Sequence, residues 1–81
     1  MSSLHYLSIE GDRTVTWDVE KAATGDVEAA EAVREAERIF EQARKKGATA
    51  FVVHPDEPAT VIDRFDPNAT QIVVVPRVQG G

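Results

Sequence analysis

The chemical group that stands out in this chain is its own C-terminal carboxylate, which follows two glycines. Gly80 and Gly81 come after the segment Pro76–Gln79, and that segment follows the most apolar run of the chain, Ile72–Val75. Because glycine has no Cβ, such a backbone can pass through a narrow slot in which any side chain would clash. Four consecutive aliphatic residues predict a strand buried on both faces of a sheet. The sequence therefore predicts a packed final strand that presents a slim, flexible tail and a reactive carboxylate.

Length and composition limit the other functions that are open to this chain. Its 81 residues predict one domain, and the absence of cysteine excludes disulfides, thiolate metal sites and a cysteine nucleophile. No run approaches the roughly 20 apolar residues that cross a bilayer. The formal net charge of -5 would repel phosphate backbones. We therefore expect a cytoplasmic protein with no membrane or nucleic-acid partner. Its negative charge serves either solubility alone or an encounter with a basic face of another protein.

The remaining polar residues do not form a pattern typical of an active site. His5 and His54 are far apart and lack ligand spacing, so no metal site is expected. No nucleophile, base and oxyanion donor can be assembled, so we expect no enzyme. Four carboxylates lie near one another in the second half of the sequence: Asp56, Glu57, Asp63 and Asp66. Such residues could do acid–base chemistry, but in loops and edge strands they are more commonly just solvated. Trp17 is expected in the core, although an exposed binding anchor is the alternative.

The elements that must position the tail can be assigned from periodicity. Residues 4–9 and 14–17 predict two strands of a hairpin, with Gly11 in the turn. Residues 18–25 are expected to form a polar connector. A helix is predicted over residues 27–46, capped by Asp26 and ended by Gly47. Its expected apolar stripe contains Ala29, Val33, Ala36, Ile39, Phe40 and Ala43.

The second half of the chain predicts three further strands. Residues 48–53, 60–65 and 71–75 have strand composition, and the short, polar 60–65 segment is expected at a sheet edge. One apolar helix stripe must cover one sheet face. Because the first and last strands are the most apolar, we expect them side by side and parallel at the centre. The predicted fold is α+β, with order β-β-α-β-β-β, a mixed sheet and one helix on one face, the β-grasp arrangement.

The end of the chain and this element order resemble the ubiquitin-like β-grasp family, especially its prokaryotic members. These members are the small sulfur carriers of molybdopterin and thiamine synthesis and the bacterial and archaeal protein modifiers. The matching run is Val74-Val75-Pro76-Arg77-Val78-Gln79-Gly80-Gly81, preceded by Phe65-Asp66-Pro67 and Gln71-Ile72-Val73. Two features depart from the sulfur carriers: Arg77 replaces a frequent second proline, and the predicted helix is longer. The resemblance implies a β-grasp domain over residues 1–76 and a flexible tail over residues 77–81.

The resemblance also implies a chemistry for the tail. In the family, a ubiquitin-activating-type adenylating enzyme uses ATP to activate the terminal carboxylate. Gly81 would be the activated residue, Gly80 the spacer, and Pro76, Arg77, Val78 and Gln79 would contact that partner. The chain itself would bind no cofactor and would do no catalysis.

Three functions remain open at this stage. The first is a protein modifier joined to target proteins, and the second is a carrier that receives sulfur as a C-terminal thiocarboxylate from a donor enzyme. The third is an adaptor whose glycines do nothing. The sheet face opposite the helix binds partners in this family, and its candidates here are His5, Thr14, Thr16 and Arg64. Exposed lysines could accept a second copy: Lys21, Lys45 and Lys46.

Overall fold

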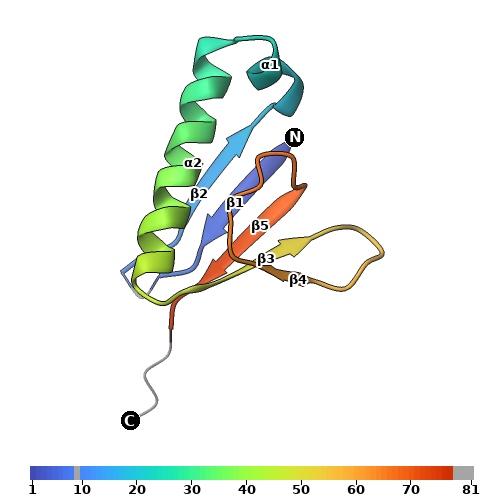
Figure 1. Cartoon of the computed structure of the whole chain (residues 1–81). Coiled ribbons are helices and arrows are strands. Elements are labelled where there is room, and N and C mark those ends of the chain that lie inside the picture. Colours follow the sequence, from blue (N-terminus) through green and yellow to red (C-terminus); the bar gives the residue numbers. More distant parts are fainter. Residues whose placement is uncertain (9, 78–81) are drawn as a thin grey trace.

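The computed structural model describes residues 1–8 and 10–77 of the chain. It contains a five-stranded sheet, one long helix and one short helix (Figure 1). In chain order these are β1 (Ser2–Tyr6), β2 (Arg13–Trp17), α1 (Val19–Ala23), α2 (Val27–Lys45), β3 (Thr49–Val53), β4 (Thr60–Ile62) and β5 (Gln71–Val75).

The sheet is mixed, and its strands lie in the order β2-β1-β5-β3-β4. The first and last strands are parallel neighbours, with Leu4 opposite Ile72 and Tyr6 opposite Val74. All other neighbouring strands are antiparallel. The predictions of a β1–β2 hairpin, of a central parallel β1–β5 pair and of β4 at an edge are therefore confirmed.

The ends of α2 are fixed by the residues that the sequence indicated. The Asp26 carboxylate accepts a hydrogen bond from the Ala29 N–H at 2.9 Å, which satisfies a donor of the first turn. At the other end, Gly47 has a φ of 89°, where an L side chain is strained. The Gly47 and Ala48 N–H groups donate to the carbonyls of Arg44 and Ala43, each at 3.0 Å. These two hydrogen bonds together form a Schellman motif, which ends the helix.

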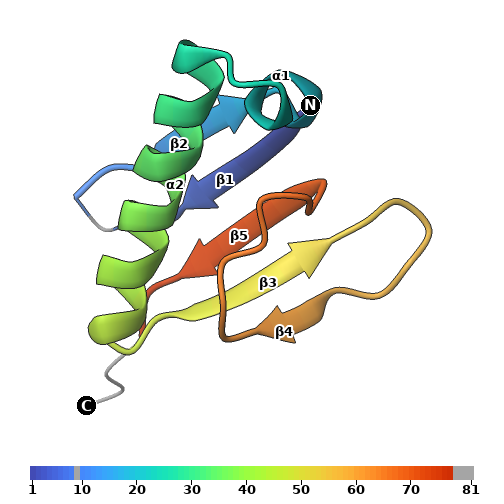
Figure 2. The ribbon, with the colours of Figure 1, turned by 45° about the horizontal axis from the view of Figure 1, so that its top comes forward.

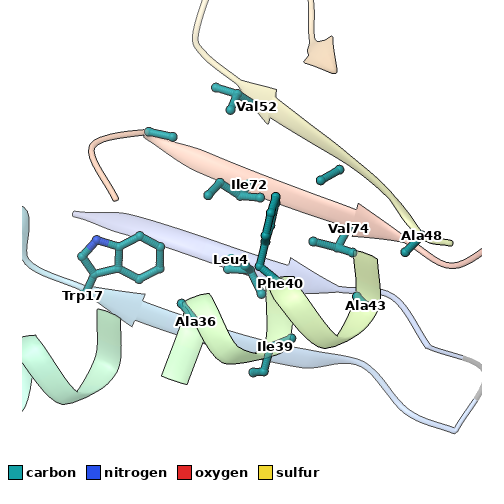
Figure 3. Close-up of a cluster of buried hydrophobic side chains, with 12 residues drawn as sticks. Leu4, Trp17, Ala36, Ile39, Phe40, Ala43, Ala48, Val52, Ile72 and Val74 are labelled. Atoms are coloured by element: carbon teal, nitrogen blue, oxygen red, sulfur yellow. The ribbon is translucent and has the colours of Figure 1, made fainter. Parts of the chain in front are cut away.

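The core lies between α2 and one face of the sheet. Phe40 points from α2 toward β5, among Leu4, Ile72 and Val74 (Figure 3). The rings of Phe40 and Trp17 both contact Phe65, with centroids 5.9 Å and 5.8 Å apart. Trp17 is 2% exposed, so its predicted place in the core is confirmed. The predicted helix stripe is also buried, except for Val33, which is only half-buried.

The structure corrects the prediction that β5 is buried on both faces, and β1 too is fully buried on one face only. Their residues alternate, and only Ile72 and Val74 of β5 are fully buried. The physical reason is that one long helix can cover one face. Figure 2 shows α2 over the β1–β2 side of the sheet, while β3 and β4 extend beyond it.

Several boundaries also differ from the sequence-based predictions. The segment 18–25 is not a simple connector, because residues 19–23 form α1, capped by the Asp18 carboxylate, which accepts from the Lys21 N–H. β1 begins at Ser2, which pairs with Trp17, and ends at Tyr6. β4 ends at Ile62 rather than residue 65, because the chain bends there and turns Phe65 into the core.

Candidate functional site at the end of the central strand

The candidate site begins where β5 ends. Thr49 of β3 is the register partner of Val75, the last residue of the strand. Pro76 follows and is half-buried, and Arg77 is exposed. The other predicted site residues, Val78, Gln79, Gly80 and Gly81, lie outside the described residues.

Arg77 packs against the C-terminal end of α2. A Cβ placed on Gly47 would lie 3.2 Å from the Arg77 Cδ and 3.8 Å from its Nη1. The absence of a side chain at Gly47 therefore leaves the space that the Arg77 stem occupies. The ends of α2 and β5 also lie at the same end of the molecule (Figure 1). Sequence reasoning missed this contact, because it joins residues 30 positions apart.

A second part of the candidate site is the sheet face opposite α2, which we call the outer face. A row of register partners crosses it from strand to strand. None of its five members is fully buried, and Val61 is 62% exposed. From edge to edge the row reads Val61, Phe51, Val73, His5 and Thr14.

The row agrees in part with the outer-face residues expected from sequence. His5 and Thr14 are adjacent in it, and the His5 Nδ1 lies 3.3 Å from the Thr14 Oγ1. Thr16 is exposed on the same face. Arg64 is exposed too, but it lies in the bend after β4 and not on a strand. The apolar members Phe51, Val61 and Val73 could have been found only from the strand register, since both parities of β5 are apolar.

The two histidines have different partners in the fold. His54 lies at the end of β3, where its Nδ1 is 3.2 Å from the Thr70 Oγ1, whereas His5 lies on β1. Residues 1–8 and 10–77 contain no group of three or more His, Asp or Glu side chains that could hold a metal. The predicted acidic group is exposed, and the Asp66 carboxylate accepts from the Asn68 N–H at 2.9 Å in a turn.

The polar network on the inner side of the molecule links α2 to β2. Glu35 accepts from Arg13 at 3.1 Å and also pairs with Arg38, one turn further along the helix. The hydrogen bond from Arg38, and then the positive charges of Arg38 and Arg13, hold the pKa of Glu35 below its ordinary value, against the opposing effect of desolvation.

Two hollows flank the core. One, of about 380 Å³, lies between the β1–β2 turn and the end of α2, and Asp12, Arg13 and Lys46 are among its lining residues. The other, of about 330 Å³, is more apolar and lies between α1, α2 and Pro67. Trp17 forms part of its wall and donates its Nε1–H to the Pro67 carbonyl at 3.0 Å. The lining of the first hollow also includes Tyr6, Ser8 and Glu10.

Comparison with known proteins gives no assignment: no family model, no curated protein and no solved structure matches this chain. Among the described residues, no helix has both the length and the apolar character needed to cross a bilayer.

Proposed function

We propose that this chain is a ubiquitin-like protein of β-grasp fold whose C-terminal Gly81 is activated by a partner enzyme and joined to target proteins. The observation that carries the proposal is the position of β5. This strand pairs on one side with β1 and on the other with β3, and its last residue, Val75, is six residues from the end of the given sequence. The strand order β2-β1-β5-β3-β4 and the parallel β1–β5 pair support the proposal of a β-grasp fold.

The arrangement suits delivery of a carboxylate into another protein. Arg77 is the last described residue, and it packs against Gly47. The four residues that follow can span at most about 14 Å when fully extended. A partner that accepts Gly81 must therefore dock close to the ends of β5 and α2. Because Gly80 and Gly81 lack side chains, the active site of such a partner could enclose the backbone tightly.

The proposed reaction takes place in the partner. A Gly81 carboxylate oxygen attacks the α-phosphorus of ATP, pyrophosphate leaves, and an acyl-adenylate forms. The amine of a target lysine then attacks the Gly81 carbonyl carbon, loses a proton and displaces AMP, which leaves an isopeptide bond. Because this chain contains no cysteine, any thioester formed between these steps uses a sulfur of the partner.

The outer face supplies the second support for the proposal. Phe51, Val61 and Val73 place apolar side chains in one row on a face that α2 does not cover. An apolar row of this kind is typical of surfaces that contact other proteins. The same row would serve a non-conjugated adaptor, and a thiocarboxylate at Gly81 would serve a sulfur carrier. Pyrophosphate exchange separates the adaptor from the other two functions, and the mass of the tryptic C-terminal fragment then separates the modifier from the carrier.

The test is reconstitution with ATP and an adenylating enzyme of the ubiquitin-activating type from the same organism. ATP–pyrophosphate exchange should depend on the chain and disappear when Gly80 and Gly81 are deleted, with unchanged folding by circular dichroism. Gly81→Ala adds one methyl group and serves as the finer variant, which should slow exchange. Exchange that persists without the diglycine, or no exchange with the full chain, would contradict the proposal and favour the adaptor.

A further inference from the structure

We infer that the C-terminal end of α2 and the base of the tail form one cationic contact surface for an acidic protein partner. This inference rests on the proposed function for its biological setting, but its physical basis is independent. Four cations make up this surface, which we call the basic cap: Arg44, Lys45, Lys46 and Arg77.

The basic cap concentrates charge of one sign in an acidic molecule. It holds four of the nine Lys and Arg residues of a chain whose formal net charge is -5. The segment 42–50 contains three of these cations and no carboxylate. By contrast, residues 27–41 of α2 contain five glutamates and only two arginines. The helix is therefore acidic along most of its length and basic at its end.

Specific contacts hold two of the four cations, Arg44 and Arg77, at the turn after the helix. The Arg44 Nη1 donates to the Ala48 carbonyl at 2.9 Å, which holds its guanidinium at the turn after the helix. Arg77 arrives from β5 and lies beside the same turn, in the space that Gly47 leaves open. Lys45 and Lys46 are exposed. Within residues 1–8 and 10–77, no ion pair joins any of the four cations to a carboxylate.

Stabilisation of the helix alone does not account for this arrangement. Cations in the last turn of a helix favourably oppose its macrodipole, each by about 0.3–1 kcal/mol. That effect explains Arg44, Lys45 and Lys46. It does not explain why Arg77, from a different element, adds a fourth positive charge against the repulsion of the other three. A negatively charged partner surface would satisfy all four charges at once.

The kind of partner follows from the rest of the surface. A nucleic acid or an anionic membrane would meet the acidic body of the molecule along with the cap. A folded protein with a local acidic patch would match the cap alone and avoid the glutamates of α2. Glu10 and Asp12 line the same hollow as Lys46, so the positively charged surface ends on the side of the β1–β2 turn. The cap therefore fits a compact acidic protein surface beside the entry point for the tail.

The test uses the full chain labelled with ¹⁵N and titrated with decaglutamate at low salt. We expect saturable amide shifts centred on residues 44–48 and 77, and their loss at about 1 M salt, where the Debye length is about 3 Å. The variant Lys45→Glu/Lys46→Glu should weaken binding by at least about tenfold. The matched control Lys21→Glu/Arg64→Glu makes the same charge change elsewhere and should bind nearly as the wild type does.

Three results would overturn the inference. They are the absence of saturable shifts, shifts centred instead on Arg13, Arg34 or Arg64, and tighter binding of the cap to duplex DNA or phosphatidylserine vesicles than to decaglutamate. Deletion of Gly80 and Gly81 should leave decaglutamate binding unchanged while it abolishes pyrophosphate exchange. Failure of the cap and failure of the proposed function are thereby distinguished, because each has its own readout.

Discussion

The two faces of β5 carry similar side chains in different surroundings. On the inner face, Ile72 and Val74 are 0% exposed and pack beneath α2. On the outer face, Val73 and Val75 are only half-buried, and no described helix covers them. Apolar residues on the inner face are explained by the stability of the fold. Those on the outer face are not needed to fill the core, and under the proposed function they contact another protein.

The largest expected difference between the faces concerns two phenylalanines. Phe40→Ala removes a buried ring from the inner core and should lower the free energy of unfolding by about 3–5 kcal/mol. Phe51→Ala, on the outer face, should cost less than half as much, because its ring is already partly in water. Urea unfolding of both variants measures the difference. Equal losses would mean that the Phe51 ring is buried as fully as the Phe40 ring, which would contradict the assignment of an exposed outer face.

Val73 and Val74 are neighbours in β5 that point to opposite faces of the sheet, so the same substitution at each compares the two faces directly. Val74→Ala should lower the free energy of unfolding by about 2–3 kcal/mol, because it removes two buried methyl groups and leaves a cavity. Val73→Ala is the matched control, with identical chemistry on the opposite face, and should cost about 1 kcal/mol or less. If Val73→Ala proves the more damaging of the two, the assignment of inner and outer faces is wrong.

A smaller loss of stability is expected for substitution of Gly47, which follows α2 and lies beside Arg77 at the base of the tail. Gly47→Ala forces a Cβ onto a residue at positive φ and against Arg77, so it should cost about 1–2 kcal/mol. Asn tolerates this conformation better, so Gly47→Asn should cost less. In NMR spectra, amide shifts should change near Arg44, Ala48 and Arg77 and not along the outer row. Changes that spread over Phe51 and Val73 would contradict this separation.

The smallest effect concerns the ion pairs that join α2 to β2 on the inner side. Because the pKa of Glu35 is lowered in the folded state, its contribution is complete above the unfolded value near 4.5 and is lost as the pH falls through the lower folded value. Glu35→Gln should therefore reduce the loss of stability on acidification, measured by urea midpoints on both sides of that value. Glu31→Gln, at an exposed position of the same helix, is the control. A parallel acid dependence in all three proteins would contradict the prediction.

Much of this fold was predictable because its strongest local signals agree with its topology. The apolar run of β5 gave its bounds correctly, and the caps Asp26 and Gly47 gave those of α2 to within one residue. α1 was missed because five residues are too few to display helical periodicity, although Val19, Ala22 and Ala23 have the right spacing. The expectation of two buried faces was wrong for a reason that the sequence already contains, since it predicts one long helix and that helix can cover one face of the sheet.

The candidate site was predicted less completely than the fold. The tail could be recognised from Pro76 to Gly81 by residue type alone, and four of its residues lie outside the described structure. The outer row and the contact of Arg77 with Gly47 depend on strand register and on the path of the chain after β5. Such contacts join distant residues, and a single sequence gives no local signal for them.

If β5 delivers a carboxylate that another protein activates, the tryptic C-terminal fragment of this chain should be found joined to other proteins. Trypsin cleaves after Arg77, so the released fragment is Val78–Gly81. When the chain is expressed in its native host and recovered under denaturing conditions, we predict that mass spectrometry will find this fragment attached to lysines of other proteins. Fragments that carry sulfur in place of one terminal oxygen would indicate the carrier instead. If only the free, unmodified fragment is found, at the same level as in a strain whose chain ends in Ala-Ala, the account is contradicted.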